Sequence, residues 1–321
     1  MAKDMYQKRK ERKENKVNNT EISNSKTNIN WYPGHMAKTK REIGEVINLI
    51  DVVVEVLDAR IPIASRNPDI QDIIKNKKRV IILNKSDLAD ERESLKWKKY
   101  FEEKEGFSTI ITDLSSGKGI PETIKQVEIV TKESQEEYSQ KGRTGKAIRI
   151  MILGIPNVGK SSFINKVAKK NTLEVANRPG VTRKKQWIKV GSNIELLDTP
   201  GVLWPKFQTE EIALNLSYTG TIKDDIIEKT EVAFCLLQYL LNNYIKNVSE
   251  RYKIDINVIE EYLKQEDIPE NERVLHIMYA IGKKRGAIVS GGHVDEEKTS
   301  NIILEDFRSG KLGRISLEKV I

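Results

Sequence analysis

The sequence predicts an α/β domain, with a mostly parallel sheet and helices on both faces, followed by a smaller all-helical domain. Between residues 31 and 208, short apolar runs alternate with helical stretches, which is the rhythm of a parallel sheet with crossover helices. After about residue 205 the strand-like runs largely vanish while helical stretches continue. Residues 1–30 are polar and predict a disordered basic tail. We therefore expect three parts, at 1–30, 31–208 and 209–321.

The individual elements follow in order from apolar runs and helix-forming stretches. The run Val52–Leu57 is interrupted only by Glu55, as expected of a strand covered on both faces. The expected strands are Val52–Leu57, Val80–Leu83, Ser108–Thr112, Ile148–Leu153, Trp187–Val190 and Ile194–Leu197. The expected helices are Ala37–Leu49, Asp69–Lys77, Glu91–Glu105, one starting near Pro121, Lys160–Ala168, Ala233–Ile245, Asn257–Lys264, Glu272–Gly282 and Thr299–Arg308. The polar stretch 133–146, with two glycines, predicts a linker.

Composition narrows the range of functions. The 321 residues carry a net charge of +8, and the middle of the chain and the tail hold the basic surplus, which suggests an anionic partner such as RNA. The single cysteine, Cys235, cannot form an intramolecular disulfide, and no cysteine cluster could hold structural zinc. No apolar stretch approaches a membrane span and no signal peptide is evident. We expect a cytoplasmic monomer without membrane contact.

A phosphate-binding loop is the strongest motif. The sequence GIPNVGKS at 154–161 matches the P-loop pattern in full and lies between an apolar strand and a helical stretch. Glycines let backbone N–H groups wrap phosphates, and the helix N-terminus adds its positive end. Lys160 would reach the β- and γ-phosphates, and Ser161 would give its hydroxyl to Mg²⁺. The context argues against a chance glycine-rich turn.

Two features downstream of the P-loop are typical of residues that contact the γ-phosphate and its Mg²⁺. Asp198-Thr-Pro-Gly201 follows the expected strand Ile194–Leu197, about forty residues after the P-loop. Asp198 would hold Mg²⁺ through water, and the Gly201 N–H would sense the γ-phosphate. Thr182 lies between the two motifs and is the candidate switch threonine that closes on Mg²⁺, although by position alone it could be a solvated loop residue.

Two loops suit a guanine base. Asn84-Lys-Ser-Asp87 follows the expected strand Val80–Leu83, and the Asp87 carboxylate could accept from both N1–H and the exocyclic amine of guanine, which adenine does not offer. Asn84 and Lys85 would brace the loop and cover the base. The loop at 113–119 follows the next strand and would offer a backbone N–H to the guanine oxygen. The predicted nucleotide contacts are Asn84, Lys85, Ser86, Asp87, Asp113, Leu114, Ser115, Asn157, Val158, Gly159, Lys160, Ser161, Ser162, Thr182 and Gly201.

The order of these motifs is permuted. In an ordinary Ras-like domain the P-loop comes first and the base loops last, whereas here NKSD is at 84 and the P-loop at 154. With the P-loop as G1, the switch threonine as G2, DxxG as G3, NKSD as G4 and the 113–119 loop as G5, the order is G4-G5-G1-G2-G3. Such a circular permutation is physically allowed because the termini of compact domains often lie close together. The stretch 133–146 would be the new join.

These motifs, with WYPGHM at 31–36, DARIP at 58–62, RPGVT at 178–182 and DTPGVLWPK at 198–206, resemble one family. The chain is similar to the circularly permuted GTPases that assemble the large ribosomal subunit, of the ribosome biogenesis GTPase A (YlqF) type within the TRAFAC class. The resemblance covers roughly residues 31–321. It implies GTP hydrolysis with Mg²⁺, GTP-dependent binding to the large-subunit precursor through rRNA and ribosomal proteins, and release on hydrolysis.

The hydrolytic machinery departs from that of many small GTPases. Val202 stands where they place a water-orienting glutamine directly after DxxG, so this position offers no carboxamide. The resemblance implies that His35 is catalytic instead, although the residues alone would favour a structural turn. Related potassium-stimulated GTPases use an asparagine like Asn157 to hold K⁺ against the phosphates; a tolerated loop residue is the alternative.

Three alternatives to this function are considered from the residues themselves. A GTP-gated RNA-binding scaffold with negligible hydrolysis is permitted by Val202. The small-subunit assembly GTPases are also permuted, but this chain has neither the length before NKSD for their OB-type domain nor the cysteines for their zinc site. The sequence also leaves open an organelle form of the large-subunit factor. The candidate rRNA contacts in the helical domain are Lys283, Lys284, Arg285, Arg308, Lys311 and Arg314, each of which could also be a solvated helix end.

Overall fold

The computed structural model describes residues 33–142, 145–170, 187–191, 193–199, 201, 203–204 and 207–320. Within them the chain divides into two compact units. The sheet unit comprises the described residues up to 216 together with 314–320, and the helical unit comprises 217–313. The expected division at 208/209 therefore differs from the observed one in two places: residues 209–216 and 314–320 belong with the sheet.

The described residues of the sheet unit form a six-stranded sheet in the order β3-β2-β1-β4-β6-β5. Four of the five pairings are parallel, and only β5 runs antiparallel to its neighbour β6. The strands are β1 (Val52–Asp58), β2 (Lys78–Asn84), β3 (Ser108–Ile111), β4 (Ile148–Leu153), β5 (Trp187–Val190) and β6 (Ile194–Asp198). Each was expected to within two residues at either end.

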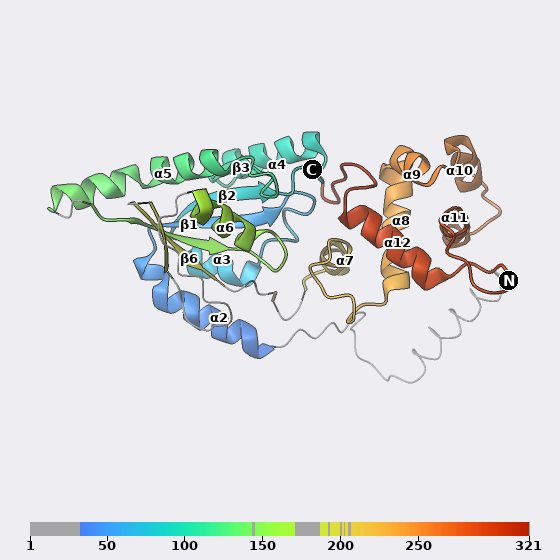
Figure 1. The fold of residues 1–321 in the computed structure, drawn as a ribbon, viewed down its shortest axis with the longest axis horizontal. Coiled ribbons are helices and arrows are strands. Elements are labelled where there is room, and N and C mark those ends of the chain that lie inside the picture. The colour runs from blue at the N-terminus through green and yellow to red at the C-terminus, as the bar shows by residue number, and fades with distance from the viewer. Residues whose placement is uncertain are drawn as a thin grey trace. The chain divides into compact units, whose positions relative to one another are not determined.

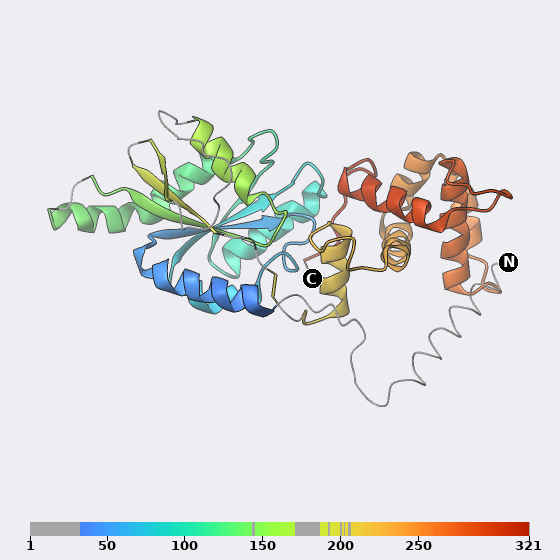
Figure 2. The same ribbon diagram turned by 60° about the horizontal axis from the view of Figure 1, so that its bottom comes forward.

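Helices cover both faces of the sheet (Figure 1). They are α2 (Pro33–Val46), a 3-10 turn at Ile47–Leu49, α3 (Pro68–Ile74), α4 (Glu91–Glu103), α5 (Ile120–Gln140) and α6 (Lys160–Lys170). Ile43 of α2 and Ile74 of α3 pack on Val53 and Met151 in one buried cluster. Trp97 and Phe101 of α4 join a second cluster that includes Leu57 of β1. Figure 2 shows α2, in blue, and α6, in yellow-green, on opposite sides of the sheet.

The strand order reverses at the β1–β4 pair. From β1 the chain proceeds outward through β2 to β3, and from β4 it proceeds outward in the other direction to β6 and β5. Ligands of open α/β sheets bind outside the carboxyl ends of the strands at such a switch point. The P-loop strand β4 is here the fourth in sequence but central in space, so the expected permuted α/β fold is confirmed.

The expected linker at 133–146 is mostly helix. Helix α5 runs to Gln140, because residues 133–140 contain glutamates and glutamines but no glycine or proline to end it. Gly142, with a φ of 72°, follows two residues after the helix. Lys146 then returns the chain to the sheet through an ion pair with Asp51 at 3.0 Å.

The helical unit is built around α8 and α12. Its helices are the end of α7 (Glu210–Tyr218), α8 (Lys229–Asn243), α9 (Ile245–Tyr252), α10 (Ile256–Leu263), α11 (Glu270–Lys284) and α12 (Glu296–Arg308). Sequence analysis missed α7 and α9. The side chains of Asp255 and Asp295 cap the first turns of α10 and α12. No helix in the described part of the chain is long and apolar enough to cross a membrane.

Two of the arginines expected to contact rRNA have partners inside the helical unit. Arg308 donates to both carboxylate oxygens of Asp224, at 2.9 and 2.8 Å, and to the carbonyl oxygens of Ser217 and Tyr218. Arg285 donates to the Arg251 carbonyl at 2.7 Å and lies over the Tyr252 ring. These guanidinium groups therefore hold the helices together.

The remaining basic residues of that expectation divide into two kinds. Lys283 and Lys284 at the end of α11 are exposed, so they stay candidates for an RNA contact. Lys311 lies 3.9 Å from Asp306 and is also exposed on one side. Arg314 belongs to the sheet unit, where it pairs with Glu91 of α4 at 3.2 Å.

Candidate guanine-nucleotide site

The P-loop leaves β4 at the switch point and has the backbone of a phosphate cradle. Gly159 has a φ of 110° and Asn157 a φ of 63°, so the loop turns through conformations that favour glycine or asparagine. A Cβ on Gly154 would lie 2.6 Å from the Val56 carbonyl oxygen, and one on Gly159 would collide with the Asn84 side chain. Both glycines are therefore required by close approach of neighbouring strands and loops.

Lys160 opens α6 and is 8% exposed. Its Nζ donates to the Ile155 carbonyl at 2.8 Å, so the ammonium group lies across the loop that it belongs to. A Cβ added to Gly201 would collide with the same Nζ. The DxxG glycine therefore lies directly against the P-loop lysine, as expected of two groups that contact the same phosphate.

Asn84 joins three loops. Its Nδ2 donates to the Val158 carbonyl of the P-loop at 2.6 Å, and its Oδ1 accepts from the Leu114 N–H of the 113–119 loop at 2.9 Å. The side chain is 4% exposed, so these bonds form away from water. The base loop beginning at Asn84, the P-loop and the 113–119 loop thus form one hydrogen-bonded unit.

Lys85 adopts a φ of 61° and turns its ammonium group back onto Asp58, at 2.9 Å from Oδ2. Asp58 ends β1, is 1% exposed, and also accepts from the Arg60 guanidinium at 3.0 and 2.8 Å. Burial alone would raise the pKa of Asp58, but the two cations beside it lower that pKa below its usual value. Asp58 is therefore a carboxylate that fixes the Lys85 side chain.

Asp87 is exposed, in contrast to Asn84. Its loop is closed by the Leu88 N–H donating to the Lys85 carbonyl at 3.0 Å, and the Ser86 N–H donates to the carbonyl of Thr112, directly after β3, at 3.1 Å. An exposed carboxylate on a loop that is fixed at both ends is available to a ligand.

The 113–119 loop is braced internally by Asp113. Its Oδ1 accepts from the Ser115 and Ser116 N–H groups at 2.8 and 3.2 Å and from the Ser115 hydroxyl. Burial opposes the charged form and would raise the pKa of Asp113, but these hydrogen bonds together outweigh it and lower that pKa to about 2. Lys166 of α6 donates to the Ser115 carbonyl. Asp113 thus shapes the loop, and Leu114, 1% exposed, anchors it.

Known proteins resemble the chain over most of its length. The pattern of the family described as 50S ribosome-binding GTPase matches residues 149–279. Ribosome biogenesis GTPase A of Bacillus cereus is 44% identical over 290 residues, covering 90% of this chain and 93% of that protein. Its namesake in Bacillus licheniformis is 45% identical over 291 residues, covering 91% and 98%. The chain belongs to the ribosome biogenesis GTPase A family. It is a GTP-binding GTP hydrolase with a role in ribosome biogenesis.

A solved structure agrees with this assignment. The crystal structure of GNP-bound YlqF from T. maritima superposes with a TM-score of 0.57 at 26% identity, covering 88% of this chain and 98% of that chain. The circularly permuted arrangement expected from motif order is thereby confirmed for this GTPase.

For several residues discussed above, the structure of this GTPase does not describe the side chain. Thr182 and Val202 lie outside the described residues. Asp198 ends β6 and His35 lies in the first turn of α2, but the side chains of both are likewise outside the described set. After Gly201, Leu203 and Trp204 are 0% and 2% exposed, so the segment beyond the DxxG motif is anchored in the core.

The residues of the P-loop fit a magnesium nucleotide. Ser161 and Ser162 are exposed in the first turn of α6, next to the buried Lys160. Mg²⁺ at phosphate sites takes one or two protein oxygens and completes its shell with water and phosphate oxygens. The Ser161 hydroxyl would supply one such oxygen. Bound Mg²⁺ would neutralise charge on the phosphates, which binding of a GTP polyanion at this loop requires.

Four residues that support the site were not predicted as site residues from the sequence. Asp58 and Arg60 were seen only as part of a motif, although a carboxylate directly after an apolar strand is a signal for a buried ion pair. Thr199 donates to the Ile152 carbonyl of β4, linking the DxxG segment to the P-loop strand. No local pattern pointed to Lys166, because its contact crosses from α6 to another loop.

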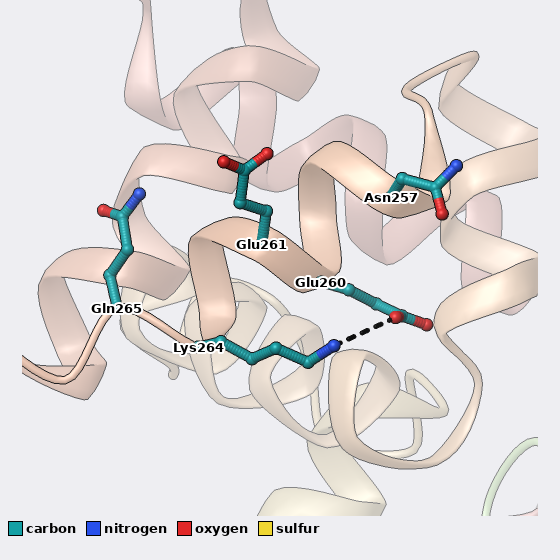
Figure 3. A pocket seen from close by; sticks show the side chains of 5 residues that line it. All are labelled: Asn257, Glu260, Glu261, Lys264 and Gln265. Atoms are coloured by element: carbon teal, nitrogen blue, oxygen red, sulfur yellow. Dashed lines mark hydrogen bonds and ion pairs between the residues drawn. The ribbon is translucent and has the colours of Figure 1, made fainter.

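A surface concavity elsewhere is unrelated to this chemistry. It lies along α10 and the two residues after that helix, and Figure 3 shows its lining side chains, among which Lys264 and Glu260 form an ion pair of 3.4 Å. None of the predicted site residues lines it; those that do are Asn257, Glu260, Glu261, Lys264 and Gln265.

Proposed function

We propose that this GTPase binds precursors of the large ribosomal subunit in its GTP state and leaves them after hydrolysis. The relatives named ribosome biogenesis GTPase A and the family described as 50S ribosome-binding GTPase support a large-subunit partner. The observation that carries the nucleotide part is the Asn84 side chain, because it joins the P-loop to both base loops. A nucleotide bound there would contact all three loops at once.

The nucleotide-dependent partner is tested by co-sedimentation. The full chain is mixed with large-subunit precursors and with mature subunits, each in a non-hydrolysable GTP analogue or in GDP. We expect co-sedimentation with precursors in the analogue and much less in GDP. Equal sedimentation in both nucleotides would contradict a GTP-dependent cycle, and preference for small-subunit particles would contradict the partner.

The site assignment is part of the same proposal. Asp87 reads the guanine edge, Lys85 covers the base, Lys160 holds the phosphates, and Ser161 binds Mg²⁺. Asn84, Ser86, Asp113, Leu114, Ser115, Asn157, Val158, Gly159, Ser162, Thr182 and Gly201 complete the nucleotide contacts. Asp198 and Thr182 join the Mg²⁺ shell, the former through water.

Asp87→Asn tests the base assignment. An amide in place of the carboxylate cannot accept from both donors of guanine, whereas it can donate to the extra carbonyl oxygen of xanthine. We expect GDP affinity to fall at least tenfold, about 1.4 kcal/mol, and xanthosine diphosphate to bind better than in the unaltered protein. The alternative result, unchanged GDP affinity, would remove Asp87 from the base site.

We also propose His35 as the group that orients the attacking water. The support is its rarity, as one of three histidines, and the lack of a carboxamide at Val202. His35→Ala should lower GTP turnover on the ribosomal particle at least tenfold while nucleotide affinity holds. His276→Ala is a matched control, because His276 stacks on Tyr262 in the helical unit. Unchanged turnover in His35→Ala would rule out this role.

Potassium is the remaining element of the proposal. The positive φ of Asn157 turns the P-loop tightly at the residue that would hold K⁺ against the phosphates. A cation there would offset negative charge that develops in the transition state. GTP turnover should fall when KCl is replaced by NaCl at equal ionic strength. Equal rates in the two salts would assign Asn157 to loop geometry only.

A further inference from the structure

Residues 314–320, which we call the strap, pack onto the sheet unit instead of the helical unit. Ile315, Ser316 and Leu317 are at most 5% exposed. Val320 packs against the core cluster formed by β1, β2 and α4. In Figure 1 this end of the chain, marked C, lies beside α4. The Trp97 indole of that helix donates to the Glu318 carbonyl at 3.2 Å.

The strap binds the end of the guanine-recognition loop at 84–87 and the loop that follows β1. The Ile315 N–H donates to the Leu88 carbonyl at 2.9 Å, immediately after Asp87. The Leu317 N–H donates to the Arg60 carbonyl, also at 2.9 Å. The strap therefore joins the exit of the base loop to the loop that follows β1.

The Glu318 carboxylate completes the hold on the loop after β1. Its two oxygens accept from the Ile63 and Ala64 N–H groups, at 2.6 and 2.9 Å. Two adjacent backbone donors on one carboxylate fix the orientation of that loop. The Asn215 amide of α7 donates to the same carboxylate at 3.4 Å.

A series of contacts through Asp58 connects Glu318 to the guanine-recognition loop. The loop held by Glu318 contains Arg60, whose guanidinium binds Asp58, and Asp58 binds Lys85 at 2.9 Å. The Ala59 N–H donates to the Asn84 carbonyl at 2.8 Å. The strap therefore holds the loop after β1, and residues 58–60 of that segment contact Asn84 and Lys85, the first two residues of NKSD.

We propose that Glu318 and the strap position the guanine-recognition loop at 84–87, so that guanine-nucleotide affinity depends on residues at the far end of the sequence. The inference rests on the proposed base site at 84–87. Glu318 is a positioning residue, because it acts on the base through Arg60, Asp58 and Lys85. The phosphate side of the site is held by other contacts, so the strap should govern affinity more than the chemical step.

The test compares Glu318→Ala with Glu297→Ala, a matched control that removes an exposed glutamate from α12. GDP and GTP dissociation constants and steady-state GTP turnover are measured on the full chain well below its melting temperature. For Glu318→Ala we expect Kd and KM to rise roughly tenfold with kcat within about twofold, since one lost charge-assisted contact is worth about one decade. The control should match the unaltered protein.

A double-mutant cycle tests the route. Asp58→Asn and Glu318→Ala should be non-additive in nucleotide affinity, because both act through the same loop. Additive effects would overturn the proposed path, and unchanged Kd in folded Glu318→Ala would overturn the proposal as a whole. If Glu318→Ala does not fold, Glu318→Asp decides by the same criteria, since its shorter side chain cannot reach both amides.

The outcomes separate this inference from the function on which it rests. If the unaltered protein failed to bind guanine nucleotide, or Asp87→Asn bound GDP normally, the base site would be wrong. If the unaltered protein binds GDP, Asp87→Asn loses it and the Glu318 variants keep it, the base site stands and only the strap inference is overturned.

Discussion

At the scale of single residues, the nucleotide site depends on side chains that bind other loops as well as the ligand. Asn84 is the clearest case, because its amide donates to the P-loop and accepts from the 113–119 loop while it is 4% exposed. Buried polar groups with both partners in place rigidify a site, and a half-satisfied group costs stability.

Asn84→Ala should therefore weaken both nucleotide binding and the fold. It leaves the Val158 carbonyl and the Leu114 N–H without their partner, so the free energy of unfolding should fall by about 1–3 kcal/mol. GDP affinity should fall at least tenfold. Calorimetric melting and nucleotide titration measure the two effects. Asn165→Ala, on the exposed side of α6, is the control and should change neither.

At the scale of elements, α11 shows how adjacent basic residues take different roles. Lys283 and Lys284 are exposed in its last turn, whereas Arg285 donates to the Arg251 carbonyl and lies over Tyr252. All three residues carry the same charge, and they differ in whether the side chain is exposed to solvent or contacts a neighbouring helix.

Two variants should divide these roles. The charge reversal Lys283→Glu with Lys284→Glu should weaken binding to large-subunit precursors without lowering the melting temperature. Arg285→Ala should lower the melting temperature, since it removes an internal hydrogen bond and a cation–π contact worth together about 1–3 kcal/mol. If the lysine reversal left particle binding intact at physiological salt, these lysines would not be RNA contacts.

The strap gives the second element-scale prediction, a pH dependence. Burial raises the pKa of the Glu318 carboxyl to about 7 despite its hydrogen bonds from Ala64 and Ile63, and the nearby Glu211 carboxylate raises it further. The folded protein therefore holds this proton more tightly than the unfolded chain does. That stabilisation is complete at acid pH and is lost as pH rises through about 7.

Glu318→Gln isolates this effect, because glutamine does not ionise. Between pH 5.5 and 8, the unaltered protein should lose about 2 kcal/mol of unfolding free energy that the variant keeps. Denaturant unfolding of both proteins at several pH values measures the difference. Parallel pH profiles for the two proteins would show that Glu318 titrates as an ordinary surface carboxyl.

At the scale of the whole molecule, the sheet unit is discontinuous in sequence. The helical unit is inserted between residues 216 and 314, and the sheet unit is completed by the strap. The Asn215 amide donates to the Glu318 carboxylate at 3.4 Å, so side chains close in sequence to the two connections contact each other. The chain can therefore be shortened there without stretching the sheet unit.

Two deletions follow from that arrangement. Replacing residues 217–313 by about ten Gly/Ser residues, a flexible span of about 17 Å, should leave a sheet unit that binds GDP. Ending the chain after residue 216 removes the strap as well and should bind GDP more weakly, by about tenfold or more. Nucleotide titration compares the two proteins. Equal affinity would show that the strap adds nothing to the base site.

The sequence alone determined what depends on local pattern. The P-loop and NKSD were predicted because phosphate and base recognition need certain residue types at fixed spacing beside a strand, and the strands themselves appear as apolar runs. The order of the two motifs was enough to predict the permuted fold. The helix α7 was missed because its short, mixed stretch has little helical periodicity, and the end of α5 because two glycines suggested an earlier stop.

Only the tertiary structure decided how the pieces support one another. Glu318 meets the loop after β1 across 255 positions of sequence, and Asn84 meets Val158 across 74. Arg308 and Arg285 read as surface charges in the sequence, yet each binds carbonyl groups of a distant helix. Such pairings carry no local signature, because a side chain's partner is chosen by the packing of elements that are remote in the chain. The motifs therefore predicted guanine-nucleotide binding from the sequence, whereas only the tertiary structure showed that the strap contacts the loop after β1 and the end of the 84–87 loop.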